Sequence, residues 1–210
     1  NTSFFLGITV GPMLLTLLEL LNAKRREALP HGSRTLITGT SGVGKSTLLR
    51  AIAGIWFTGS GTVAMPQKSS RLFLPQHPYL PLGTLRRVLS YPRTAAASDK
   101  KMTHVLAQVG LPHLAARLSD TDDWSRILSL GEQQRLAFAR ILLIRPDWVF
   151  LDEATSALDE PRERILYELL RQELPMAGII SVGHRSTLYA FHETEIRIHD
   201  NTIVSQEIPT

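Results

Sequence analysis

The sequence predicts an α/β fold with a mainly parallel sheet, helices on both faces and a small helical subdomain. Short apolar stretches alternate with longer segments whose apolar residues recur at helical spacing. The central stretches are apolar along their whole length, which is typical of strands that are covered on both faces. A length of 210 residues suits one domain into which a subdomain is inserted.

The elements in the first half of the chain follow from this pattern. Residues 34–38 are predicted to form a short buried strand, and a glycine-rich stretch separates it from a helix over 45–56. Residues 71–74 are predicted as a second strand, which Pro75 ends. The subdomain is placed at about 84–128, where short helical patterns are interrupted by glycine and proline.

The second half continues the alternation of strands and helices. Helices are predicted over 129–144 and 161–174, and buried strands over 148–151 and 179–182. The stretch 196–204 is predicted to be a hairpin that turns at an Asp-Asn pair. In a parallel sheet of this kind ligands bind beyond the carboxyl ends of the strands, so polar motifs at those ends are candidates for a functional site.

The first 28 residues are expected to form an irregular segment or linker. Residues 4–21 are mostly apolar, and three interpretations are open: the end of a membrane-spanning helix, a buried element of this domain, or a join to a missing partner. The buried element is favoured. Because the chain begins at Asn1 and not at a methionine, we expect it to be a piece of a longer protein.

Composition excludes several classes of protein. The absence of cysteine excludes disulfides, thiolate metal sites and a cysteine nucleophile. The formal net charge of +4 is compatible with binding to nucleic acid or to an anionic membrane surface. The densest basic run, Lys24 to Arg26, is too short for a polybasic signal, so we expect no nucleic-acid partner.

The glycine-rich stretch after the first strand matches the phosphate-binding pattern G-x-x-x-x-G-K-[ST]. Glycines let the backbone wrap around a phosphate with its N–H groups pointing inward, and the dipole of the following helix favours an anion. Lys45 is expected to reach the β- and γ-phosphates, and the Ser46 hydroxyl to bind Mg²⁺. The pattern predicts a P-loop NTPase that binds the phosphates of a nucleotide through Gly39, Thr40, Ser41, Gly42, Val43, Gly44, Lys45 and Ser46.

Two adjacent acids, Asp152 and Glu153, follow the predicted apolar strand 148–151. Adjacent acids are usually solvated loop residues, but at the end of a buried strand in a chain with a phosphate loop they favour a catalytic interpretation. Asp152 would hold Mg²⁺, directly or through water. Glu153 is then left to polarise the attacking water.

The predicted helix over 129–144 begins with a second motif. Ser129 and Glu132 match a capping box. The capping box does not explain Gly131, because glycine costs about 1 kcal/mol relative to alanine within a helix. A glycine there lets another backbone or a phosphate approach, and a helix N-terminus with a hydroxyl and N–H groups can bind an anion. We interpret Ser129, Leu130, Gly131 and Glu132 as a site for ATP bound by a partner chain.

Taken in order, the motifs resemble the ATPase domain of the ATP-binding-cassette (ABC) superfamily. They are the phosphate loop, the isolated Gln76, Leu-Ser-x-Gly-Glu at 128–132, the pair Asp152-Glu153, Ser-Ala-Leu-Asp at 156–159, and His184. Leu130, where most members carry glycine, and the segment 74–86 resemble one branch of the superfamily. That branch holds peroxisomal fatty-acyl transporters and bacterial fused transporters of the vitamin B12 or peptide type.

The resemblance implies a head-to-tail dimer with two ATP molecules between the chains. Each ATP would lie between Gly39–Thr47 of one chain and Ser129–Glu132 of the other, so Thr47 is also an implied ATP-binding residue. Gln76 would contact Mg²⁺ and the lytic water, Asp159 would contact the opposite chain, and His184 would hydrogen-bond the γ-phosphate. The implied cofactors are ATP and Mg²⁺. The implied catalytic residues are Glu153, His184, Gln76 and Lys45, and the implied metal ligands are Ser46, Gln76 and Asp152.

Residues 29–210 would then be the ATPase domain. We expect it to form a homodimer and to power transport through a transmembrane domain fused upstream, at the cytoplasmic face of a bacterial inner membrane. Two alternatives are open. The basic charge is compatible with a soluble ABC ATPase that acts on nucleic acid or the ribosome. Residues 14–21 lack the aromatic residue that stacks on adenine in the family, which is compatible with a degenerate ATP-binding module.

Overall fold

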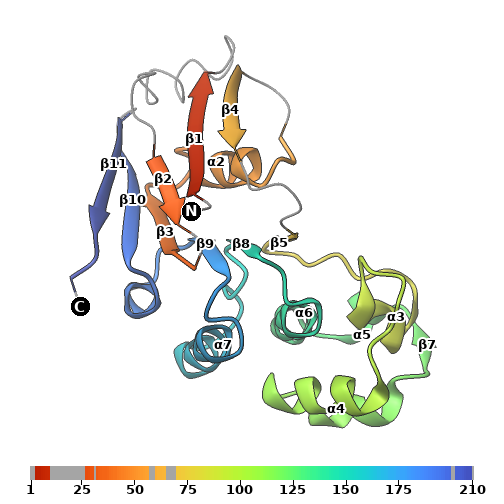
Figure 1. The fold of residues 1–210 in the computed structure, drawn as a ribbon. Helices are drawn as coiled ribbons and strands as arrows, with labels where there is room; N and C mark the ends of the chain where they lie inside the picture. Colours follow the sequence, from red (N-terminus) through yellow and green to blue (C-terminus); the bar gives the residue numbers. More distant parts are fainter. Residues whose placement is uncertain are drawn as a thin grey trace. The chain divides into compact units, whose positions relative to one another are not determined.

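The computed structural model describes residues 3–9, 27–30, 32–56, 60–64, 70–199 and 202–209 (Figure 1). These residues divide into two compact units. The first unit draws on the chain up to Phe73, on Asp147–Asp152, and on the chain from Met176 onward. The second unit consists of Leu74–Pro146 and Glu153–Pro175. The predicted site residues are consequently divided between the two units.

The first unit contains a six-stranded sheet. Its strands are β3 (Arg34–Gly39), β5 (Arg71–Leu74), β8 (Trp148–Asp152), β9 (Gly178–Val182), β10 (Thr194–His199) and β11 (Thr202–Glu207), and a 3-10 helix, η3 (Ser186–Phe191), connects β9 to β10. The strand order is β11-β10-β3-β9-β8-β5. Strands β10, β3, β9 and β8 run parallel, and β11 pairs antiparallel with β10. The prediction of a mainly parallel sheet is confirmed, and so is the predicted C-terminal hairpin.

The core of the first unit contains residues of this sheet and of helix α2 (Lys45–Ile52). Every residue of β8 and β9 is buried, as predicted for strands that are apolar throughout. Leu48 and Ile52 of α2 belong to the same buried cluster as Trp148 of β8. Gly178 makes room for that indole, because a Cβ at Gly178 would lie 2.3 Å from the Trp148 ring. This packing anchors β8, the strand whose end carries the predicted acids.

A three-stranded sheet contains the first strand of the described chain. It consists of β2 (Glu27–Pro30), β1 (Ser3–Thr9) and β4 (Ser60–Ala64), and both strand pairs are antiparallel. The expectation of an irregular segment over residues 1–28 therefore does not hold for residues 3–9. Strand β1 pairs with β4, which lies beyond the phosphate loop in the sequence, and local periodicity does not reveal such a pairing. Residues 10–26 lie outside the described residues.

The second unit is mainly helical and extends beyond the subdomain predicted at 84–128. Helices α6 and α7 belong to it, and the Phe138 and Tyr167 rings of these two helices meet edge to face with centroids 6.2 Å apart. None of the described helices combines the length and apolar composition that a membrane crossing requires. The elements are β6 (Gly83–Thr84), α3 (Leu85–Ser90), α4 (Asp99–Gln108), η2 (Pro112–Arg117), β7 (Thr121–Asp122), α5 (Trp124–Ile127), α6 (Leu130–Ile144) and α7 (Glu160–Glu173).

Candidate functional site

The phosphate loop connects β3 to α2 through three glycines with positive φ angles. Gly39 has a φ of 143°, and a Cβ there would lie 2.4 Å from the Ile198 carbonyl oxygen of β10. Gly42 has a φ of 80°, and no described atom lies within 4 Å of its Cβ position. Gly44 has a φ of 97° and is the N-cap of α2. The first glycine allows the close approach of β10, and the other two turn the backbone as a phosphate cradle requires.

The N-terminus of α2 is suited to an anion. Among the described residues no side chain caps this helix, and its first turn contains no acid. Lys45 is only 6% exposed, and its Nζ donates hydrogen bonds to the carbonyl oxygens of Gly39 and Thr40 at 2.9 Å each. The ammonium group therefore lies at the loop beside the helix end. A phosphate chain would meet both the helix dipole and this positive charge.

Ser46 and Asp152, two of the three residues that the sequence analysis assigned to Mg²⁺, are in direct contact. The Ser46 hydroxyl donates to Asp152 Oδ1 at 2.6 Å. Hydroxyl and carboxylate oxygens suit Mg²⁺, which usually takes its remaining ligands from substrate phosphates and water. The residues therefore fit a metal bound together with ATP. Within the described ranges, no cluster of three His, Asp or Glu side chains forms a metal site of its own.

Arg50 is a site residue that the sequence analysis missed. Its Nη2 forms an ion pair with Asp152 Oδ2 at 3.2 Å, so both carboxylate oxygens have protein partners. Arg50 follows Ser46 by four residues on α2, and residues at this spacing lie on one helix face. That spacing is the signal by which Arg50 could have been found.

The register of the sheet brings the ends of three strands to one edge. Ile37 of β3 pairs with Val182 of β9, and Val182 pairs with Asp152 of β8. The Gly183 N–H donates to the Ile37 carbonyl at 3.5 Å, which keeps the loop after β9 beside the end of β3. His184 is exposed in this loop. The phosphate loop, Asp152 and His184 therefore follow strand ends at the same edge, as predicted.

In the second unit, the predicted capping box is present at the start of α6. The Ser129 hydroxyl oxygen accepts from the Glu132 N–H, and the Glu132 carboxylate accepts from the Ser129 N–H at 2.9 Å and hydroxyl at 2.7 Å. The hydrogen bond that the Ser129 hydroxyl donates to the Glu132 carboxylate lowers the pKa of Glu132. Leu130 and Gly131 are half-buried in the first turn. A Cβ at Gly131 would lie 3.2 Å from the Ala157 carbonyl oxygen, so the expected close approach is made by the chain's own backbone.

Gln76 follows β5 and contacts two residues that the sequence analysis gave no role. The side-chain Nε2 of Gln76 donates to the Ser156 hydroxyl oxygen at 3.3 Å. The backbone carbonyl oxygen of Gln76 accepts from Gln134 Nε2 at 2.9 Å. Gln134 lies on α6 and is completely buried. A glutamine three residues after Gly131, on a helix whose other buried residues are mostly apolar, is the signal in the sequence that could have marked it.

Glu153 and Asp159 occupy distinctive positions in the backbone of the second unit. Glu153 has a φ of 50°, an uncommon angle for a residue with a side chain, and such strain collects at functional sites. Asp159 is the N-cap of α7: its carboxylate accepts from the Arg162 N–H at 2.9 Å and pairs with the Arg162 guanidinium at 2.5 Å. Asp159 therefore has a structural role in addition to the predicted contact with another chain.

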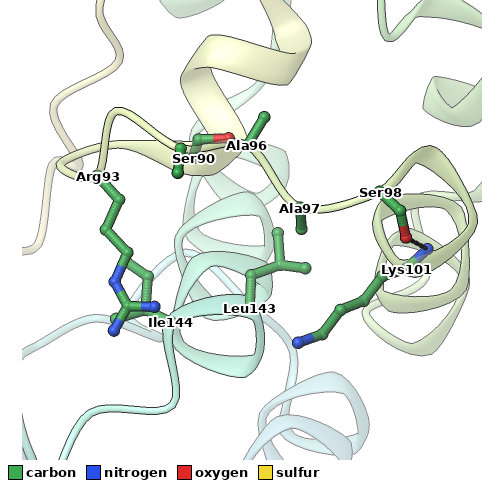
Figure 2. A pocket seen from close by; sticks show the side chains of 9 residues that line it. Ser90, Arg93, Ala96, Ala97, Ser98, Lys101, Leu143 and Ile144 are labelled. Atoms are coloured by element: carbon green, nitrogen blue, oxygen red, sulfur yellow. Dashed lines mark hydrogen bonds between the residues drawn. The ribbon is translucent and has the colours of Figure 1, made fainter.

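A pocket of about 280 Å³ lies elsewhere in the second unit (Figure 2). Arg93 and Lys101 lie on opposite sides of it, with Leu143 between them. None of the predicted site residues lines this pocket. They form two other sets: the phosphate loop, Asp152 and His184 belong to the first unit, and Gln76, Glu153, Ser129–Glu132 and Asp159 belong to the second.

Comparisons with known proteins identify the family to which this chain is similar. A family model described as ABC transporter matches residues 26–156. An uncharacterised ABC transporter ATP-binding protein of Haemophilus influenzae is 49% identical over 191 residues, which cover 90% of this chain and 31% of that protein. The human lysosomal cobalamin transporter ABCD4 is 40% identical over 184 residues, which cover 81% of this chain and 30% of that protein. The chain therefore spans about a third of the length of these relatives.

Among solved structures, a bacterial Atm1-family ABC exporter with ATP bound superposes with a TM-score of 0.82. The superposition covers 99% of this chain and 38% of that chain. The sequence identity is 23%, so this likeness concerns the fold alone. It confirms the α/β P-loop NTPase fold that the sequence pattern predicted.

Proposed function

Because the chain belongs to the ABC transporter family, whose ATP-binding domains hydrolyse ATP, we propose that it binds ATP with Mg²⁺ at its phosphate loop and powers transport across a membrane. The relative ABCD4 agrees with the vitamin B12-type branch expected from Leu130 and residues 74–86. One observation carries the proposal. The Ser46 hydroxyl and the Asp152 carboxylate meet at 2.6 Å beside the phosphate loop, although they lie 106 residues apart in the sequence.

The triphosphate would lie in the phosphate loop, where the N–H groups of the loop and of α2 donate to it. The Lys45 ammonium group, which donates to the carbonyl oxygens of Gly39 and Thr40, would then donate to the β- and γ-phosphates instead. Ser46, Asp152 and Gln76 would hold the metal. When bound, Mg²⁺ neutralises the charge that develops on the β- and γ-phosphate oxygens.

Glu153 would act as the general base. It would accept a proton from the attacking water while the water oxygen bonds to the γ-phosphorus and ADP leaves. The left-handed backbone angle of Glu153 supports this assignment, because strained residues collect at active sites. Gln76 would orient the water, and His184 would hydrogen-bond the γ-phosphate from the exposed loop after β9.

Residues Ser129–Glu132 would bind the ATP held by a second copy of the chain, and Asp159 would contact that copy. The exposed position of Ser129 and the N-terminal end of the 15-residue helix α6 support an anion site there, at which a phosphate would replace the Glu132 carboxylate as the partner of the Ser129 hydroxyl. The ATPase domain would include strand β1, which pairs with β4, and would be joined to a transmembrane domain at the cytoplasmic face of a bacterial inner membrane. The Haemophilus influenzae relative, only 31% of which aligns, has room for such a domain.

The test compares Glu153→Gln with the wild-type sequence in the full-length protein. The substitution removes the proton acceptor but keeps the size of the side chain. ATP binding should therefore persist while phosphate release falls at least about 100-fold. Glu160→Gln is the matched control, since Glu160 is an exposed acid at the start of α7. If Glu153→Gln hydrolyses ATP at the rate of the control, the proposed mechanism is wrong.

A further inference from the structure

Gln134 of α6 is completely buried, and its side-chain amide is hydrogen-bonded at both ends. Its Nε2 donates to the backbone carbonyl oxygen of Gln76 at 2.9 Å and to the hydroxyl oxygen of Ser156 at 3.2 Å. Its Oε1 accepts from the N–H of Ala157 at 3.0 Å. One side chain thus joins α6 to two loops that are separate in the sequence.

Gly131 lies three residues earlier on α6 and completes this arrangement. Because a Cβ at Gly131 would lie 3.2 Å from the Ala157 carbonyl oxygen, only glycine lets the loop come this close without displacement. The backbone of Ala157 is therefore held at its N–H by Gln134 and packed at its carbonyl against the first turn of α6. Ser156 also accepts a hydrogen bond from the Gln76 side chain at 3.3 Å, which ties the two loops to each other.

Packing alone does not require a glutamine at this position. Most other buried residues of α6 are apolar, and methionine has nearly the same length and shape as glutamine. An apolar side chain would fill the space but would leave the Ala157 N–H and the Gln76 carbonyl without the partner they now have. The amide of Gln134 is therefore suited to positioning the two loops.

We propose that Gln134 is a positioning residue that makes the Gln76 loop and the loop 156–159 move as one body with Ser129–Glu132. This inference rests on the proposed function, in which Gln76 serves the ATP of its own chain. In the same proposed function, Ser129–Glu132 bind the ATP held by the second copy of the chain, and Asp159 of the loop 156–159 contacts that copy. Gln134 consequently links the two nucleotide sites of a pair, so that ATP at one site favours ATP at the other.

Gln134→Met tests this link in the full-length protein, with Gln133→Met as the matched control. Gln133 is the next residue of α6, and its amide donates to the carbonyl oxygens of Ser125 and Leu128, outside the two loops. The wild-type protein should hydrolyse ATP with a Hill coefficient above 1. Gln134→Met should lower the turnover number about tenfold and bring the Hill coefficient to 1, with the affinity for ADP unchanged. The control should keep the wild-type Hill coefficient.

Hydrogen exchange gives a readout that does not depend on catalysis. The Ala157 amide should exchange faster in Gln134→Met and at the wild-type rate in the control. Ser156→Ala is a second variant in case Gln134→Met does not fold, because it removes the shared acceptor from an exposed loop. It too should bring the Hill coefficient toward 1.

The two proposals fail in different ways. If the variants at Gln134 and Ser156 keep the turnover and Hill coefficient of the control, the positioning role is wrong, although the wild-type protein still hydrolyses ATP. If the wild-type protein shows no hydrolysis that depends on Glu153, the proposed function is wrong instead.

Discussion

The Ser46 hydroxyl of α2 donates a hydrogen bond of 2.6 Å to the Asp152 carboxylate at the end of β8. The contact joins the helix after the phosphate loop to a strand that lies 106 residues further along the chain. Arg50 pairs with the other carboxylate oxygen at 3.2 Å. The fold of the first unit therefore brings together Ser46 and Asp152, two of the three side chains that we expect to bind Mg²⁺ with ATP.

Ser46→Ala should weaken ATP binding only when Mg²⁺ is present. The substitution removes one oxygen ligand and leaves Asp152 paired with Arg50. We expect the Kd for ATP, measured by calorimetry, to rise about tenfold with Mg²⁺ and to stay unchanged in EDTA. Ser186→Ala, at an exposed serine outside the loop, is the control. An equal loss of affinity with and without the metal would contradict a role in Mg²⁺ binding.

Gly39→Ala should destabilise the protein far more than Gly42→Ala. The new methyl group at Gly39 would lie 2.4 Å from the Ile198 carbonyl oxygen, in a backbone conformation with φ of 143°. We expect the free energy of unfolding to fall by about 3 kcal/mol. At Gly42 nothing in the described chain lies within 4 Å, so only the strain of the left-handed angle, about 1 kcal/mol, is expected. Urea denaturation measures both, and equal losses would disprove the close approach of β10.

The protein should lose stability below pH 6.5 because of His192. Burial lowers the pKa of His192 to about 4; the hydrogen bond to the Leu188 carbonyl opposes this shift, and the charge of Arg34 adds to it. The unfolded chain, with a histidine pKa of 6.5, binds the proton first. The stability that neutral, buried His192 contributes to the folded protein is therefore fully present above pH 6.5 and is lost as the pH falls toward 4. We expect the free energy of unfolding to be lower by about 2 kcal/mol at pH 5 for this reason.

His192→Gln provides the comparison for this prediction. The variant lacks the titrating imidazole, so its free energy of unfolding should fall less than that of the wild-type protein between pH 7.5 and pH 5 when both are measured in urea. The same slope in both proteins would show that the loss comes from other groups.

Two substitutions at Asp159 separate its role as a helix cap from its predicted contact with a second chain. Asp159→Ala removes the acceptor of the Arg162 N–H and should lower the free energy of unfolding by about 1 kcal/mol. Asp159→Asn keeps a good N-cap and should leave stability nearly unchanged. We expect both variants to reduce ATP turnover, because both lack the charge. If Asp159→Asn has wild-type turnover, Asp159 serves only as a cap.

The parts of the fold that could be predicted are those with a local signature. Strands β8 and β9 are buried at every residue and show this as continuous apolar runs. The capping box of α6 lies within four residues, Ser129 to Glu132, and was predicted correctly. Strand β1 could not be predicted in this way, because it pairs with β2 and β4 across long stretches of intervening sequence. The assignment of α6 and α7 to the helical unit depends likewise on packing between separate segments.

By itself, the sequence determined the fold class of this chain and its membership of the ABC transporter family, and it predicts which residues would carry the chemistry. The phosphate loop, Asp152 with Glu153, and Ser129 to Glu132 are each short patterns of residue types whose function depends on local geometry. Only the tertiary structure decided which of these patterns meet: Ser46 with Asp152, and Gln134 with the loops of Gln76 and Ala157. The physical reason is that such contacts depend on strand order, register and helix packing, which residues distant in sequence establish together.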